Sequence, residues 1–338
     1  MSHKTTIKDL ALAADVSVTT VSQILNGKGK RFSSETILRV QNLKEKLNYV
    51  PNFNARNLIL KDAKTIGVVV PNLGNPFFSS FVDGIQGACR DNGYLPFNFS
   101  GDNDIQLESY YMEQLIGRGI NGLIIASSSI TMSIINDIVK KNNIPYLLMD
   151  QSPLSDGDQV RTNDLFGGRL IADHLLKNGH RKIAIVMPKN ATNNIQLRIT
   201  GFKEMLKERN IDFESNVTVI NAPLTKEGGT NAAESVVTSG VTAVFAVNDE
   251  MAIGLYRGLK DLGIDIPTQM SVIGYDGTDL SLYMHPNLTT VAQPIRKMGE
   301  VATELLINRI DHRNINRQVV EMPVELMNRF SVASPRKY

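Results

Sequence analysis

The sequence predicts a two-part α/β protein, with an N-terminal all-α head and a two-lobed body built on parallel sheets. The chain opens with two short helical patterns joined by a tight turn. From Thr65 onward, short apolar runs alternate with helical patterns, which is typical of strands buried on both faces of a parallel sheet. A strand-leading segment at Gly119 recurs at Gly240, so we expect two similar lobes that face each other across a cleft.

The first helix of the head is predicted to begin at residue 7. Thr6 and Asp9 stand at the spacing of a capping box, in which each side chain accepts a hydrogen bond from the other's backbone. Ile7, Leu10 and Ala14 then recur at helical spacing, so one face of this helix is expected to be apolar.

The second helix of the head is predicted to follow the break at Asp15-Val16, with Ser17 as its N-cap and Val21 and Ile24 facing inward. Its outward face begins with small and polar side chains, namely Val18, Thr19, Ser22 and Gln23. Such a face suits a recognition helix in the DNA major groove. The alternative is an ordinary helical hairpin in a larger α domain.

The head also carries a strong positive charge. A third helix is predicted from Ser33 to the segment that ends at Pro51, because the residue before a proline is pushed out of the helical region. Residues 1–64 contain 11 lysines and arginines against five acidic residues, whereas residues 65–338 contain 25 against 29. A basic head on a mildly acidic body is the electrostatic footprint of a module that contacts phosphates.

Composition excludes several other classes of protein. A chain of 338 residues suits a small head and a larger body better than one compact domain. It has no apolar stretch of about 18 residues and no apolar leader, so we expect a cytoplasmic protein without a membrane span. Cys89 is the only cysteine and the five histidines are scattered, so we expect neither a metal site nor a cofactor.

The body is expected to alternate strand and helix throughout. A helix is predicted over Phe78 to Asn92, and glycines stop several later helical patterns. The apolar runs expected to form strands lie at 66–70, 123–126, 146–149, 183–186, 217–220, 243–247 and 272–275, with a further strand-like segment at 289–292.

Polar and aromatic side chains gather at the predicted strand ends, where ligands bind in open α/β sheets. These candidates are Asn75, Phe77, Phe78, Asp150, Arg198, Asn248, Asp276 and Gln293. Carboxylates, amides and a guanidinium suit the hydroxyl groups of a small polyol, and no glycine-rich phosphate loop is present. Each residue also has a plain structural reading, as a helix cap, a surface ion pair or a core aromatic.

Several strings in the sequence carry a family resemblance. They include the head segment 6–22, Leu47-Asn-Tyr-Val-Pro-Asn, Asn75-Pro-Phe-Phe, Asn163-Asp to Gly167-Gly, Arg198-x-x-Gly-Phe, Asn248-Asp-Glu-Met-Ala, Gly274-Tyr-Asp and Leu288-Thr-Thr-Val. Over essentially its whole length, the chain resembles the lactose repressor family of bacterial transcription regulators, with members that respond to ribose among the most similar. The second-lobe strings are also similar to a periplasmic ribose-binding protein, which shares the body fold.

The resemblance implies a division of labour along the chain. Residues 1–50 would form the helix-turn-helix DNA-binding head, 51–64 a hinge helix and linker, and 65–338 an effector-binding and dimerisation body. Lobe 1 of the body would comprise about 65–161 and 292–322, and lobe 2 about 162–291 and 323–338. The implied partners are a pseudo-palindromic operator in double-stranded DNA, a small sugar and a second copy of the chain.

The resemblance also implies the residues that contact DNA, which are Thr6, Ser17, Val18, Thr19, Thr20, Ser22, Gln23, Asn26, Asn52, Ala55, Arg56 and Leu58. Many relatives have arginine in place of Gln23, and glutamine prefers adenine edges where arginine prefers guanine. Leu58 matches the family's apolar wedge, which unstacks a base step in the minor groove. So short a hinge segment cannot hold a helix alone in water, so its order should depend on DNA and on the dimer partner.

The effector is the least determined element. The eight strand-end residues align with the positions by which ribose-binding relatives hold the pentose, but Gln151 stands where the ribose carrier has arginine. Members that respond to sucrose or another disaccharide, to purines, or to a co-repressor use similar frames. Two other classes are disfavoured. A transport-type sugar-binding protein would not carry the basic head, and an enzyme with Asp150 and Asp276 as acid and base would lack a nucleophile, metal or cofactor loop.

Overall fold

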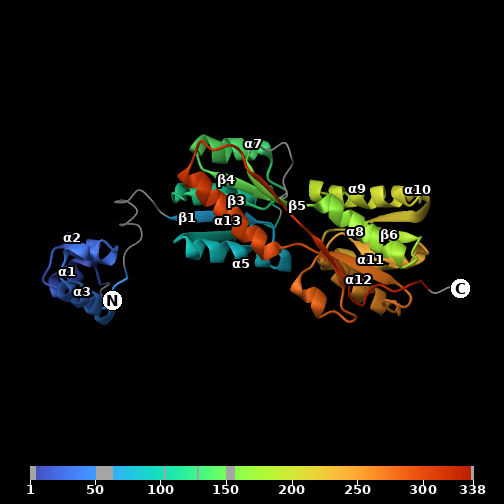
Figure 1. Ribbon diagram of the computed structural model, residues 1–338, viewed down its shortest axis with the longest axis horizontal. Coiled ribbons are helices and arrows are strands. Elements are labelled where there is room, and N and C mark those ends of the chain that lie inside the picture. The colour runs from blue at the N-terminus through green and yellow to red at the C-terminus, as the bar shows by residue number, and fades with distance from the viewer. Residues whose placement is uncertain (1–4, 51–63, 103, 128, 150–156, 336–338) are drawn as a thin grey trace. The chain divides into compact units, whose positions relative to one another are not determined.

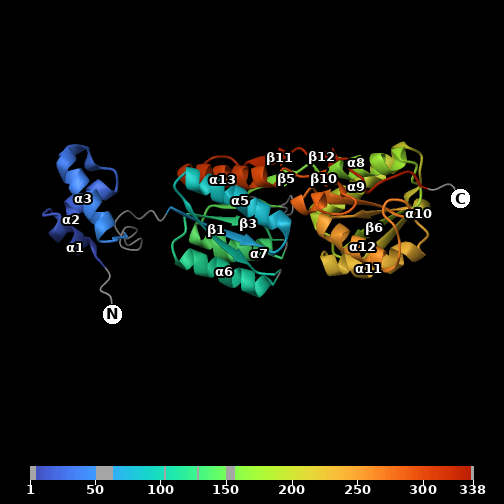
Figure 2. The same ribbon diagram turned by 90° about the horizontal axis from the view of Figure 1, so that it is seen from below.

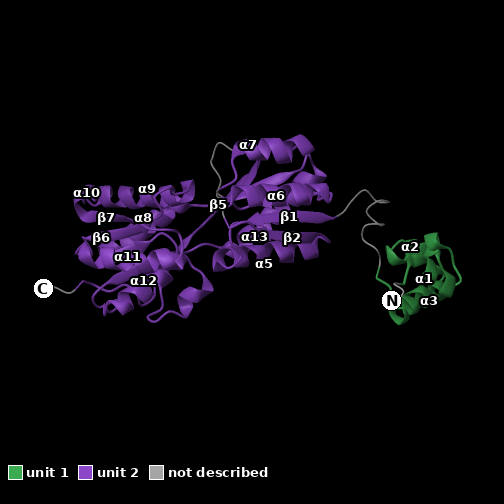
Figure 3. Cartoon of the chain, turned by 180° about the vertical axis from the view of Figure 1, so that it is seen from behind, with its two compact units in different colours: residues 1–63 green, residues 64–338 purple. Residues whose placement is uncertain are grey.

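The computed structural model describes residues 5–50, 64–102, 104–127, 129–149 and 157–335. The chain divides into two compact units, residues 1–63 and 64–338 (Figure 3). Apart from Lys64, the expected hinge segment 51–64 lies outside the described residues. In the part that is described, no helix is long and apolar enough to cross a membrane.

Within its described residues, 5–50, the head unit contains three helices and one short 3₁₀ turn; Figure 2 labels the helices. Helices α1 (Ile7–Ala13), α2 (Val18–Leu25) and α3 (Ser34–Lys46) are joined by a tight turn and by η1 (Gly29–Arg31). The capping box at the start of α1 is confirmed, because the Thr6 N–H donates to Asp9 Oδ2 at 2.7 Å and the Asp9 N–H donates to Thr6 Oγ1 at 3.3 Å. Asp15 makes the turn into α2 with a φ of 51°.

The core of the head is small and comes from all three helices. Leu10 and Ala14 of the first helical segment, Val21 of α2 and Val40 of α3 have no solvent exposure. These are the residues that the helical spacing placed inward, and they pack into one cluster. Ile24 of α2 belongs to the same cluster, whereas Val18 and Thr19 at the start of α2 face solvent.

The first lobe of the body is a six-stranded sheet in the order β11-β5-β4-β3-β1-β2 (Figure 1). The strands are β1 (Thr65–Val70), β2 (Leu95–Ser100), β3 (Gly122–Ile125), β4 (Tyr146–Met149), β5 (Asp158–Thr162) and β11 (Val319–Met322), all paired in parallel. Helices α5 (Pro76–Asp91) and α13 (Ile295–Asp311) share a core with one face of this sheet. The other face packs against α6 (Ile105–Gly117) and the turns α7 (Met132–Ile134), η2 (Ile135–Val139) and η3 (Lys140–Asn142).

The second lobe repeats this plan in the order β12-β10-β9-β8-β6-β7. Its strands are β6 (Ile183–Met187), β7 (Val217–Asn221), β8 (Ala243–Ala246), β9 (Ser271–Asp276), β10 (Thr289–Ala292) and β12 (Glu325–Met327). Its helices are α8 (Asp164–Lys177), α9 (Asn193–Glu208), α10 (Phe213–Asn216), α11 (Lys226–Thr238) and α12 (Asp249–Asp261), with the short turn η4 (Asp279–Leu282). The expectation of parallel sheets is confirmed except at β12, which pairs antiparallel with β10.

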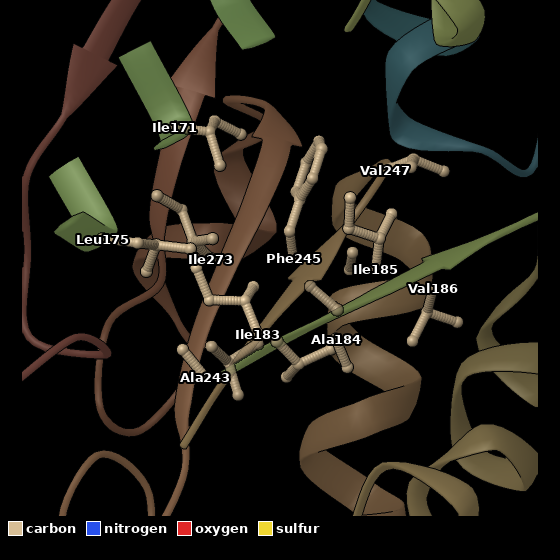
Figure 4. Packing of buried hydrophobic residues seen from close by; sticks show 14 of the residues in the cluster. Ile171, Leu175, Ile183, Ala184, Ile185, Val186, Ala243, Phe245, Val247 and Ile273 are labelled. Atoms are coloured by element: carbon tan, nitrogen blue, oxygen red, sulfur yellow. The ribbon is translucent and has the colours of Figure 1, made fainter. Parts of the chain in front are cut away.

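The core of the second lobe explains why its strands read as continuous apolar runs. Figure 4 shows Phe245, Ile183 and Ile273 from neighbouring strands beside Ile171 and Leu175 of α8. All five side chains are fully buried. Strands covered by helices on both faces have no solvent face on which polar residues could alternate.

The chain passes between the lobes at three places, from β5 to α8, from β10 to α13 and from β11 to β12. Beside the first crossover, α8 and α9 pack closely through glycines. A Cβ at Gly168 would lie 1.8 Å from the carbonyl oxygen of Arg198, and one at Gly201 would lie 1.8 Å from that of Leu165. This close approach brings Arg198 on α9 against the start of α8.

Candidate nucleic-acid interface and effector site

The start of helix α2 presents a short exposed face. The Ser17 hydroxyl caps the helix by accepting a hydrogen bond from the Thr20 N–H at 3.1 Å, as predicted. Val18 is 40% exposed and Thr19 is also exposed at the first turn, where side chains of a recognition helix reach base edges. Thr6 is exposed too and is held by its capping box with Asp9.

The second turn of α2 is more constrained. Ser22 and Gln23 are half-buried, and the Asn26 amide donates to the Ser22 carbonyl at 2.7 Å. The Gln23 side-chain oxygen accepts a hydrogen bond from the Arg31 guanidinium, which belongs to η1. The Arg31 guanidinium therefore orients the Gln23 side-chain amide.

Some predicted site residues cannot be placed. The hinge contacts Asn52, Ala55, Arg56 and Leu58 and the effector candidate Asp150 lie outside the described residues.

Two of the expected effector ligands are helix N-caps at strand ends. Asn75 follows β1, and its Oδ1 accepts a hydrogen bond from the Phe77 N–H at 2.8 Å at the start of α5. Asn248 follows β8, and its Oδ1 accepts from the Met251 N–H at 2.9 Å at the start of α12. Both residues thus have a structural role as helix caps. The Asn248 amide lies at the carboxyl end of β8, where ligands bind in such sheets, whereas the Asn75 amide is already engaged by Glu250.

Arg198 lies at the centre of a buried polar network in the second lobe. Its Nε donates to Asp164 Oδ1 at 2.8 Å, and its Nη1 donates to the Val247 carbonyl at 2.7 Å. The same Nη1 lies 3.9 Å from Asp276 Oδ1, and the guanidinium carbon stands 3.7 Å from the ring centroid of Tyr275. The arginine is 3% exposed, so these contacts replace its hydration.

The charges of this network stabilise one another. Burial by itself lowers the pKa of Arg198, but the carboxylates of Asp164 and Asp276 and the neighbouring Tyr275 raise it above its ordinary value, so the guanidinium stays charged. Burial also raises the pKa of the Tyr275 hydroxyl well above its usual range, and Asp164 adds to that shift. One cation thus serves two carboxylates.

Asp276 is held by Gln293, which follows β10. The Gln293 amide donates to Asp276 Oδ1 at 2.8 Å, and its backbone N–H donates to the Asp276 carbonyl at 2.9 Å. The Gln293 Oε1 accepts from the Thr162 hydroxyl at 3.0 Å, at the end of β5 in the first lobe. The structure therefore brings Arg198, Asp276 and Gln293 together, and links them to the first lobe.

Asp276 has a strained backbone. Its φ is 119°, a region that residues with a side chain rarely adopt, and the next residue, Gly277, has a φ of 71°. Such strain costs on the order of 1–3 kcal/mol and clusters at ligand sites, where neighbouring contacts maintain it. This strain is an independent reason to place Asp276 in a binding site.

A second direct hydrogen bond joins the two lobes, between Asn75 and Glu250. The Asn75 amide donates to Glu250 Oε2 on α12 at 3.1 Å, and Glu250 Oε1 lies 3.2 Å from the ammonium of Lys226 at the start of α11. Phe77 is buried in the core of the first lobe, and half-buried Phe78 meets it edge-to-face with centroids 5.2 Å apart. Phe78 is therefore better placed than Phe77 to cover the face of a sugar.

A cavity of about 250 Å³ adjoins the same network. Its lining comes from β5, β11 and the starts of α8 and α9, and includes Thr162, Asn163, Asp164, Asn194 and Leu197. The amides of Asn163 and Asn194 and the Thr162 hydroxyl make part of its lining polar, and none of the strand-end candidates among the described residues lines it.

Sequence reasoning missed Thr162, Asp164, Tyr275 and Glu250 as parts of the site. Three of them stand inside the strings that carry the family resemblance, Asn163-Asp, Gly274-Tyr-Asp and Asn248-Asp-Glu. Their neighbours Asn248 and Asp276 were predicted instead, because amides and carboxylates at strand ends directly suggest ligand contacts. The supporting partners become visible only when the two strand ends and α9 are in place.

The comparisons with known proteins agree with both parts of the chain. Residues 6–52 match the lacI family of bacterial regulatory proteins, and residues 172–332 match the periplasmic binding protein-like domain. The HTH-type transcriptional repressor PurR of Photobacterium profundum is 33% identical over 332 residues, which cover 97% of this chain and 98% of that protein.

Two solved structures share the fold. A LacI family transcriptional regulator from Enterococcus faecium with bound ribose is 37% identical with a TM-score of 0.76, and the match covers 80% of this chain and 100% of that one. The lac repressor dimer bound to operator and the anti-inducer ONPF is 25% identical with a TM-score of 0.83, over 98% of this chain and 100% of that one. The predicted combination of a helix-turn-helix head and a periplasmic-binding-protein-like body is confirmed.

Proposed function

Given that the chain belongs to the lacI family of bacterial regulatory proteins and is a DNA-binding transcriptional repressor, we propose that it represses a sugar-utilisation operon and leaves its operator when a ribose-like sugar binds between the lobes. The observation that carries this proposal is the buried set of Arg198, Asp276 and Gln293 in the second lobe, which the Gln293–Thr162 hydrogen bond links to the first lobe. Guanidinium and amide N–H groups offer donors, and the carboxylate offers acceptors, for the hydroxyls of a sugar.

Ribose is favoured among sugars for two reasons. The Enterococcus faecium regulator with bound ribose is 37% identical to this chain. The site also has one cation between two carboxylates, so it offers no excess positive charge for a phosphate. A neutral pentose fits this balance.

The proposed switch works through the lobes and the hinge. The sugar would contact Asn75 from the first lobe and Arg198 and Asp276 from the second, and so favour lobe closure. Closure in both protomers of a homodimer would separate the paired hinge segments. Since a short helix is unstable alone in water, the separated hinges would lose their order and their grip on the minor groove.

A purine is the second candidate effector, because repressors named PurR align with 97% of this chain. Calorimetric titration of the full chain with ribose, other pentoses, hexoses, sucrose, cellobiose, hypoxanthine and guanine tests the assignment. Micromolar binding of ribose without measurable heat from the purines is expected. Saturation by a purine and not by ribose would show that the effector is a purine. If the purine also raised operator affinity, the proposed direction of the switch would be wrong.

Gln23 is expected to read one base pair of each half-site. Gln23→Ala should change the preference at that position by about 1–3 kcal/mol, because a bidentate amide contact to a base is lost. Anisotropy titrations against operators varied one base pair at a time measure this. Lys30→Ala is the matched control, since loss of an exposed cation should weaken all sequences alike. A uniform loss in Gln23→Ala would contradict base reading.

Leu58 is expected to act as the wedge in the minor groove. Leu58→Ala should weaken specific operator binding by about 2 kcal/mol and reduce DNA bending, because the base step is no longer held unstacked. Circular-permutation gel shifts measure the bend, and sugar affinity should stay at the wild-type value. Undiminished bending in the variant would show that Leu58 does not enter the duplex.

A further inference from the structure

A buried carboxylate, that of Asp249, is hydrogen-bonded to the segment that carries Asp276. Asp249, the first residue of α12, is 1% exposed. Its Oδ2 accepts from the Thr278 backbone N–H at 2.8 Å and from the Thr278 hydroxyl at 3.0 Å, while its Oδ1 accepts from the Thr290 hydroxyl at 2.7 Å. One side chain therefore joins α12, β10 and the segment that follows β9.

That segment needs external support. Asp276 and Gly277 both have positive φ angles, 119° and 71°. On the β10 side, Gly277 lies so close to Ala292 that a Cβ would stand 2.5 Å from the Ala292 Cβ, and the Gln293 N–H donates to the Asp276 carbonyl. From α12, Asp249 supplies further support by accepting hydrogen bonds from Thr278, which stands two residues after Asp276.

We propose that Asp249 is a positioning residue for effector binding, which keeps Asp276 in its binding conformation by holding Thr278. The proposal deepens the function given above and rests on it, because it takes Asp276 as a ligand of the sugar. Asp249 itself touches neither the effector nor Arg198 in this account. It acts through the backbone of residues 276–278.

A substitution of Asp249 can test the positioning of Asp276 without unfolding the protein. Burial raises the pKa of Asp249 to about 6, against the hydrogen bonds from Thr290 and Thr278 and the charge of Arg329. Burial disfavours the charged form of Asp249. The neutral and isosteric Asp249→Asn avoids that desolvation cost and should therefore fold as well as the wild type. It can still accept from the Thr278 N–H through its amide oxygen.

The test compares ribose affinity in full-length variants by calorimetry, with operator affinity measured without sugar. Asp249→Ala should raise the Kd for ribose about tenfold, and Asp249→Asn should restore most of the affinity. Operator affinity without sugar should not change in either. Thr278→Val and Thr290→Val each remove one hydroxyl donor without changing shape, and should give smaller losses in the same direction; they decide the matter if Asp249→Ala fails to fold.

A matched control and a mutant cycle complete the design. Asp212 makes the same kind of hydrogen bonds, to the Ser215 N–H and hydroxyl, at the exposed start of α10. Asp212→Ala should leave ribose affinity unchanged. If Asp249 acts through Asp276, adding Asp249→Ala to Asp276→Asn should cost less affinity than it costs the wild type.

The outcomes distinguish this inference from the function on which it rests. Wild-type ribose affinity in Asp249→Ala, or full additivity in the cycle, overturns the positioning role while the effector assignment stands. A wild type that takes up no ribose overturns both. Selective loss of ribose affinity, restored by asparagine and coupled to Asp276, supports the inference.

Discussion

Asp276→Ala is expected to abolish the response to sugar and to leave the repressor on its operator. Asp276 Oδ1 accepts from Gln293 and lies beside the Arg198 guanidinium, and in the proposed function its carboxylate accepts hydrogen bonds from the sugar hydroxyls. Charged hydrogen bonds to a ligand contribute about 1.5–3 kcal/mol each, so losing one or two of them raises the Kd for ribose by about two orders of magnitude. Calorimetry and operator release measured side by side check this.

Asp279→Ala serves as the control, because Asp279 is exposed three residues further on and no hydrogen bond of its side chain is seen among the described residues. It should bind sugar and release DNA like the wild type. Continued release of Asp276→Ala from the operator by sugar would show that the effector binds elsewhere.

Arg198→Ala is expected to lower the free energy of unfolding by about 3–5 kcal/mol, the cost of leaving buried charges without their partner. Asp164 and Asp276 are 2% and 5% exposed and share this one guanidinium. Denaturant titration followed by circular dichroism measures the loss.

The control for this prediction is Arg257→Ala, which breaks an exposed ion pair with Asp261 on the surface of α12. Such pairs contribute little, so its unfolding midpoint should match that of the wild type. Asp164→Asn combined with Arg198→Met removes the cation and one of its two carboxylates, and should recover part of the stability. A stability change in Arg198→Ala as small as that of the control would contradict a buried charge network.

Much of the fold was predictable because it depends on local signals. The capping box at Thr6 and Asp9 and the cap at Ser17 identify the helices of the head, and both are present. The runs at 66–70 and 183–186 identify β1 and β6, because fully covered strands contain only apolar residues.

The missed strands lack that signal. Strand β2 includes Pro96, and its last four residues alternate between phenylalanine and a polar residue, because it lies at the edge of the sheet. Strand β5 contains Asp158, which is buried only because Arg309 of α13 pairs with it at 2.7 Å. A charged residue whose partner lies so far along the chain cannot be recognised as buried from its neighbours in sequence.

The candidate site shows the same limit. Strand-end position alone identified Asn75, Asn248 and Asp276, since amides and carboxylates are conspicuous there. Asp164, which pairs with Arg198, and Glu250, which accepts from Asn75, act through long-range packing, such as the close approach of α8 and α9 at Gly168. Only the folded body brings these residues into contact.

In the proposed function, a sugar bound in the body controls the affinity of the head for its operator. The most direct test is the affinity of the full-length protein for its own upstream operator, measured by anisotropy at rising concentrations of ribose. We expect operator affinity to fall by at least about tenfold as the sugar site fills, in step with calorimetric saturation. Saturation by ribose with no change in operator affinity would contradict it.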